Sequence, residues 1–188
     1  WRPLQGLFGS KTTELPPEAC TVEELCRFAD VKLDINGQNH NVPVDMGRSL
    51  VCIVLEAEPA VPGSRLKLAK QDTLDQVTKR SPGPYSAIIA LGGDRAPTGT
   101  LALIVNGVVY QKEALNLAGM GVRALVAAPQ LEISADHAEV VENDAYETLL
   151  REIEEHSLGL ADLLAEQVVD MNALDRVEAT DFIKQFAS

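Results

Sequence analysis

Apolar and polar residues alternate in two stretches of the chain, and each stretch contains an Asn-Gly pair. Val31–Ile35 precedes Asn36-Gly37, and Leu101–Val105 precedes Asn106-Gly107 and the apolar run Val108–Tyr110. An Asn-Gly pair between such runs is the strongest short-range signal for a type I′ hairpin, because both central residues need a positive φ. We therefore predict two β-hairpins. Their second arms are residues 41–44 and 108–110.

The apolar segment Ser49–Ala57 fits two structures. The β-branched residues Val51, Ile53 and Val54 favour a buried strand. A helix would be capped by Ser49 and would align Leu50, Val54 and Leu55 on one face. We predict the helix.

The remaining pattern up to residue 142 alternates short helical and extended segments. A capping box at Thr21 predicts a helix through Ala29, and Asp72 is a suitable cap for a short amphipathic helix. The predicted helices are 21–29, 73–80 and 112–120, and the predicted extended segments are 85–91, 122–127, 131–134 and 138–141.

From Asn143 onward the chain becomes acidic and amphipathic. A second capping box at Asp144-Ala-Tyr-Glu147 opens a helical stripe, which continues over Leu158–Val169 and Ala173–Phe186. We expect breaks near Gly159 and Asn172. This tail either packs on its own domain or forms a docking surface. The chain divides into an N-terminal arm (1–20), a central domain (21–142) and a helical C-terminal extension (143–188).

Composition narrows the classes of function. The net charge of −12 argues against nucleic-acid binding, which requires a basic surface. No apolar run reaches the roughly 18 residues of a membrane span. The three cysteines, Cys20, Cys26 and Cys52, contain no CxxC pair, so we interpret them as ordinary thiols in a reducing compartment. Pairing or metal sharing by Cys20 and Cys26 is the alternative.

No catalytic or metal-binding arrangement stands out. The three histidines, His40, His137 and His156, lack metal-ligand spacing. The acidic cluster around Glu152–Glu155 is typical of a solvated helix face. We therefore predict a protein that is not an enzyme, with no cofactor and no bound metal.

The order of the elements resembles the plant- and adrenodoxin-type [2Fe–2S] ferredoxins. The first hairpin leads into Gly47-Arg-Ser-Leu50, a glycine-rich loop follows at Gly92–Gly99, and the end of the domain matches in Gly121–Val126 and the two extended segments after it. The resemblance covers about residues 31–142. It implies an α+β fold, a β-grasp ferredoxin-like domain carrying the N-terminal arm and the helical C-terminal extension.

The cysteines that define that family are missing. The positions that would ligate the cluster fall at Gly92, Thr98, Leu101 and Leu125 or Val126, and none of these side chains can ligate iron. Asp94 is the only plausible ligand for a lone ion in this loop. The resemblance therefore implies a redox-inactive accessory subunit, similar to the ferredoxin-like bridge subunit of mitochondrial complex I. Its partners would be other subunits, and its location mitochondrial or otherwise cytoplasmic.

The alternative is an α/β three-layer fold that binds a nucleotide or phosphate with the Gly92–Gly99 loop. Tyr85–Gly93 and Leu101–Leu117 would then form half of a βαβ unit with Val122–Ala127. This interpretation predicts a parallel sheet and a helix that spans Asn106-Gly107. A glycine in the middle of a helix costs about 1 kcal/mol relative to alanine.

Overall fold

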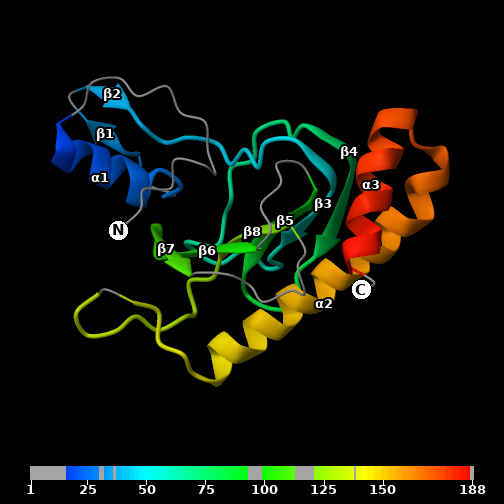
Figure 1. Ribbon diagram of the computed structural model, residues 1–188. Coiled ribbons are helices and arrows are strands. Elements are labelled where there is room, and N and C mark those ends of the chain that lie inside the picture. Colours follow the sequence, from blue (N-terminus) through cyan, green and yellow to red (C-terminus); the bar gives the residue numbers. More distant parts are fainter. Residues whose placement is uncertain are drawn as a thin grey trace.

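The computed structural model describes residues 16–29, 32–35, 37–92, 99–112, 121–137 and 139–186. Within them the elements are α1 (Pro17–Cys26), β1 (Asp34–Ile35), β2 (Gln38–Asn39), β3 (Ser49–Glu56), β4 (Thr73–Arg80), β5 (Ser86–Leu91), β6 (Thr100–Val105), β7 (Val108–Lys112), β8 (Val122–Ala127), α2 (Asp144–Gln167), a short 3-10 helix η1 (Val168–Asp170) and α3 (Ala173–Phe186). The central sheet lies between α1 with the β1–β2 hairpin on one side and α2 with α3 on the other (Figure 1).

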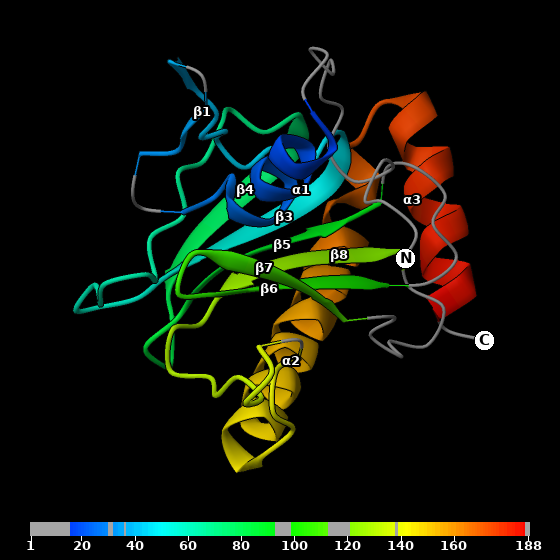
Figure 2. The same ribbon diagram turned by 90° about the vertical axis from the view of Figure 1, so that its left-hand side faces the viewer.

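The central sheet has six strands in the order β4-β3-β5-β8-β6-β7. Two neighbouring pairs, β3 with β4 and β6 with β8, are parallel, and the other three are antiparallel. Figure 2 looks onto this sheet from the α1 side, and α2 runs obliquely behind it. The chain is therefore a mixed α+β protein, as the sequence predicts at this coarser level.

Both faces of the sheet are covered, and this explains its apolar strands. On one face, Leu103 and Val126 belong to a core that lies under α2. Leu149, Ile153 and Leu164 of the helix contribute to the same core. The opposite face carries a second core that the segment before β3 covers. Its members are Phe28, Val44, Met46, Cys52, Val54, Ile88, Ala90, Ala102, Ile104, Val109, Leu125 and Ala127. A strand covered on both sides is a continuous apolar run rather than an alternating one.

The second predicted hairpin is confirmed, and the first is confirmed in part. Asn106 and Gly107 have φ angles of 52° and 83° and join β6 to β7. The first hairpin consists only of β1 and β2, with Gly37 at a φ of 82°. The arm predicted over 41–44 is not a strand, since Val44 forms only an isolated bridge with Leu68.

Two predicted helices are wrong. Residues 49–56 form β3, in the interior of the sheet, where an apolar run buried on both faces satisfies its backbone through two neighbouring strands. Residues 73–80 form β4, which pairs in parallel with β3 and exposes every second side chain over its first part. Tertiary pairing outweighs the weak helical pattern of each segment.

The predicted helix at 21–29 exists but begins earlier. α1 starts at Pro17 and ends at Cys26. Proline suits the first helical turn because its missing N–H would have no partner there. Of the extended segments, 85–91 and 122–127 correspond to β5 and β8, and 131–134 and 138–141 meet through a bridge between Ile133 and Val140.

The C-terminal helices are confirmed with one difference. α2 is capped by Asn143, whose side-chain oxygen accepts hydrogen bonds from the N–H groups of Ala145 and Tyr146. The helix continues through Gly159, so the predicted break there is wrong, because packing against the sheet outweighs the cost of one glycine. The break before α3 at Asn172 is confirmed. In the described part of the chain, no helix is both long and apolar enough to cross a membrane.

The alternative βαβ unit is wrong, because Asn106-Gly107 is a hairpin turn and not part of a helix. The helix that the ferredoxin resemblance implies after Gly47 is replaced by β3. The arm predicted over 1–20 is described only from residue 16, and its last four residues belong to α1. Residues 1–15, most of the Gly92–Gly99 loop and most of the helix predicted at 112–120 lie outside the described residues.

Candidate functional site

The residues at the degenerate cluster positions do not come together as a site. Leu101 is 2% exposed in the core under α2, whereas Leu125 is fully buried in the core on the opposite face of the sheet. Val126, the alternative fourth position, lies on the α2 side. Gly92 follows β5 directly and has a φ of 76°, and Thr98 lies outside the described residues. The leucines are core residues, and their burial explains their apolar character.

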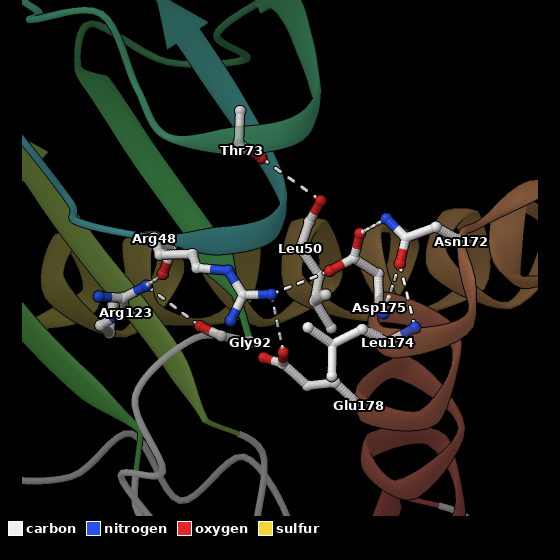
Figure 3. A network of polar contacts seen from close by, with 9 residues as sticks. All are labelled: Arg48, Leu50, Thr73, Gly92, Arg123, Asn172, Leu174, Asp175 and Glu178. Carbon is white, nitrogen blue, oxygen red and sulfur yellow. Dashed lines mark hydrogen bonds and ion pairs between the residues drawn. The ribbon is translucent and has the colours of Figure 1, made fainter.

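Arg123 joins the glycine of this loop to the segment before β3 (Figure 3). The buried guanidinium donates hydrogen bonds to the carbonyl oxygens of Arg48 at 2.5 Å and Gly92 at 3.1 Å, and also to that of Met46. These three carbonyls come from two chain segments at the same end of the sheet. The charged donor therefore fixes both segments to the start of β8, which is a structural role.

Arg48 extends this network to α3. Its guanidinium lies 2.9 Å from an oxygen of Asp175 and 3.1 Å from one of Glu178 (Figure 3). Asp175 is 6% exposed, and the amide of Asn172 also donates to its carboxylate. The Glu178 carboxylate, followed by the hydrogen bond and charge of Asp175, raises the pKa of Arg48. The cluster attaches the start of α3 to the end of the sheet.

The other side chains that can take part in catalysis or metal binding are dispersed over the structure. His40 is buried with its Nδ1 3.1 Å from an oxygen of Glu23, and this contact ties α1 to the segment after β2. None of the three cysteines forms a disulfide in the described part of the chain, and burial raises the pKa of Cys52. Among the described residues, no three His, Cys, Asp or Glu side chains are placed to hold a metal ion.

The outer edge of β4 is the most distinctive surface feature. β4 is eight residues long, it pairs with β3 on one side, and no strand of the described part of the chain pairs with its other side. In a parallel pair, alternate residues direct their N–H and C=O groups away from the partner. About half of the backbone groups of β4 therefore point outward. Such an edge is a template for pairing with another chain.

A groove of about 440 Å³ lies beside this edge, between α2 and the sheet. Ile53 and Val77 from the sheet and Leu160 and Leu163 from the helix provide its apolar surface. The polar residues that line it are Lys79, Glu155, His156, Asp162 and Glu166. Gly159 also lines the groove, and a side chain added there would meet no atom within 4 Å.

The charges around the groove are mainly negative. Burial, the largest cause, and the nearby charge of Lys79 lower the pKa of His156, whereas Glu152 and Glu155 act in the opposite direction. His156 is therefore neutral at pH 7. Among the residues that line the groove, the three carboxylates outnumber the single ammonium group of Lys79.

The sequence pattern does not indicate this site, because residues 73–80 fit a short amphipathic helix. Thr73, Val77 and Thr78 are β-branched, which was the available signal for a strand. Leu74 and Val77 also share one helical face, so the pattern is ambiguous.

Comparisons with protein-family models, with curated protein sequences and with solved structures gave no match for this chain.

Proposed function

We propose that the protein is a non-catalytic subunit that binds an extended segment of another protein along the outer edge of β4. The observation that carries this proposal is the eight-residue edge strand with a groove directly beside it. In strand addition, main-chain hydrogen bonds provide affinity and neighbouring pockets provide specificity. β4 and the groove together supply both parts.

The energetics favour a role within a larger assembly. About eight outward backbone groups, if all were paired at about 0.5–1.5 kcal/mol each, would contribute about 4–12 kcal/mol. Burying one apolar side chain of the bound segment, or the aliphatic part of a Lys or Arg side chain, would add about 1.5–3 kcal/mol. Association itself costs about 4–15 kcal/mol. The edge alone therefore gives weak binding, and stable attachment needs further contacts of the kind that a multi-subunit complex provides.

A narrower form of this proposal comes from the ferredoxin resemblance. It makes the protein a redox-inactive β-grasp ferredoxin-like subunit of a mitochondrial respiratory complex that stabilises neighbouring subunits. Its support is the order of elements in the sequence, and β3 removes one part of that support by occupying the place of the implied helix. Binding along β4 does not depend on this ancestry.

The test is a selection of ten-residue peptides from a displayed random library against the full chain. Selected peptides are then synthesised in two N-methylated forms. One form carries methyl groups on the odd-numbered amides and the other on the even-numbered amides. A strand directs alternate amides to opposite sides, so only one form loses the hydrogen bonds to β4.

We expect one N-methylated form to bind at least about tenfold more weakly, since three lost hydrogen bonds amount to about 1.5–4.5 kcal/mol. The other form should retain the affinity of the unmodified peptide. Equal affinity of the two forms would contradict strand addition.

A further inference from the structure

From the residues beside β4 we infer that the bound segment alternates basic and apolar residues, with its Lys or Arg side chains directed toward α2. This inference rests on the proposed function, because it assumes an added strand. It specifies the chemistry of the partner, which the open edge alone does not determine.

The side of β4 that faces α2 suits long cationic side chains. Val77 is paired with Ile53, and both line the groove together with Leu160 and Leu163. Lys and Arg lay their aliphatic stems on apolar surface and keep the charged end in water. A basic side chain from the added strand would place its stem on this surface and its charge at the helix.

The exposed side of α2 provides carboxylates for those charges. Glu155, Asp162 and Glu166 are exposed and line the groove, and Gly159 leaves the space between them open. The stretch from Glu155 to Glu166 spans about 16 Å of helix at 1.5 Å per residue. Five residues of an extended segment cover about the same length. Several basic side chains of one segment therefore have carboxylates within range.

The opposite side of β4 offers one apolar contact, at Leu74, beside the polar residues Gln76 and Thr78. Leu74 is 51% exposed, and it lies on the face of β4 that points away from the α2 groove, as do Gln76 and Thr78, which pair with Cys52 and Val54. An apolar side chain on the added strand would cover Leu74, because side chains of neighbouring strands on one face contact each other. The two sides together require alternation of basic and apolar residues.

A second copy of this chain is a poor occupant. Pairing of two β4 strands would place two α2 helices along one continuous sheet and bring their carboxylates together at the shared edge. Like charges facing each other disfavour such pairing, and the net charge of −12 adds to the repulsion. A basic segment relieves this negative charge.

The test uses eight-residue peptides with capped ends and fluorescence anisotropy at about 0.1 M salt, where the Debye length is about 10 Å. The panel contains four peptides. Three of them alternate Val with Lys, Glu or Thr, and the fourth, the segregated peptide, has four Lys followed by four Val. Each exposed ion pair contributes about 0.2–1 kcal/mol, so three pairs predict that the alternating Lys peptide binds about tenfold tighter than the Glu peptide. The segregated peptide should bind several-fold more weakly than the alternating Lys peptide.

Matched variants locate the charges. The double substitution Asp162→Lys and Glu166→Lys should reverse the preference between the Lys and Glu peptides. The control is Glu132→Lys with Glu139→Lys, which makes the same change in net charge at exposed positions outside the groove. We expect less than about a twofold change in this control, because neither residue lines the groove and salt screens exposed charges at longer range.

The outcomes separate the inference from the function. If the Thr peptide protects the amides of β4 from hydrogen exchange and the Lys peptide binds no tighter, the inference is wrong and strand addition stands. Equal affinity of the segregated peptide and the alternating Lys peptide also overturns the inference. If no peptide protects β4, or the free protein dimerises through β4, the proposed function is wrong as well.

Discussion

The two edges of the central sheet differ in how they are protected. β7 is five residues long, follows a tight hairpin and is contacted by α1. β4 is eight residues long, and the described part of the chain places a groove beside it rather than another strand. Short length and cover by a helix are common protections against unwanted pairing. β7 has both, and β4 has the geometry of an edge that receives a partner.

The side chains of the two edge strands follow the same difference. Val109 of β7 is 3% exposed and belongs to the core on the α1 side. Val77 of β4 is only half-buried, although it has the same side chain and lies on a covered face of the sheet. The β7 edge is part of the core, whereas the β4 edge lies at its margin. A partner segment could therefore dissociate from β4 without opening either core.

The largest predicted effect concerns α2, which forms one wall of the groove. Leu164→Ala removes a fully buried side chain from the core between α2 and the sheet. We expect a loss of about 2–5 kcal/mol in the free energy of unfolding, measured by urea denaturation. Leu158→Ala makes the same substitution in the same helix at a 45% exposed position, and should cost less than about 0.5 kcal/mol. Equal losses in the two variants would contradict the described packing of α2.

A smaller effect compares the two edges directly. Val109→Thr places a hydroxyl in a buried position and should cost about 1–3 kcal/mol of stability. The same substitution at Val77 should cost less than about 0.5 kcal/mol, because water reaches that side chain. Chemical denaturation of both variants measures the difference. If Val77→Thr were as destabilising as Val109→Thr, the β4 edge would be as well covered as β7.

The smallest predicted effect is a pH dependence at the groove. The pKa of His156 is lowered in the folded protein, mainly by burial and then by Lys79. The unfolded chain therefore binds a proton at His156 more readily, and stability decreases as the pH falls from about 6.5 through the folded pKa. His156→Gln should flatten this part of the profile of urea midpoints between pH 7.5 and pH 5.

The matched control for this profile is His137→Asn. His137 is exposed and has a φ of 56°, a conformation that asparagine adopts readily. This variant should keep the pH dependence of the unmodified protein. Parallel profiles for His156→Gln and the unmodified protein would show that His156 does not contribute to it.

The sequence predicted the parts of the fold that local chemistry determines. Asn106-Gly107 specifies its own turn through the positive φ angles, and the apolar stripe of α2 specifies a helix on a covered surface. β3 and β4 were assigned to helices because a fully buried strand loses its alternation and β4 shows only a weak one. Their pairing with distant strands outweighs local preference.

The candidate site was less predictable than the fold. Motifs with known chemistry point to the Gly92–Leu101 loop, because glycine-rich loops and cluster positions are recognisable in a sequence. The β4 site is defined by a strand edge that no described strand pairs with, and by the approach of α2 residues such as Leu160 and Asp162 to Val77. These relations connect residues far apart in the chain, and the sheet order is needed to see them.

Backbone amide hydrogen exchange, measured residue by residue on the full chain with and without a selected peptide, reports directly whether a segment is added along β4. We predict that alternate amides within residues 73–80 become protected on binding, because only the outward N–H groups gain partners. The amides of β7 should not change. Protection at β7, or a bound peptide that leaves residues 73–80 unprotected, would contradict the account.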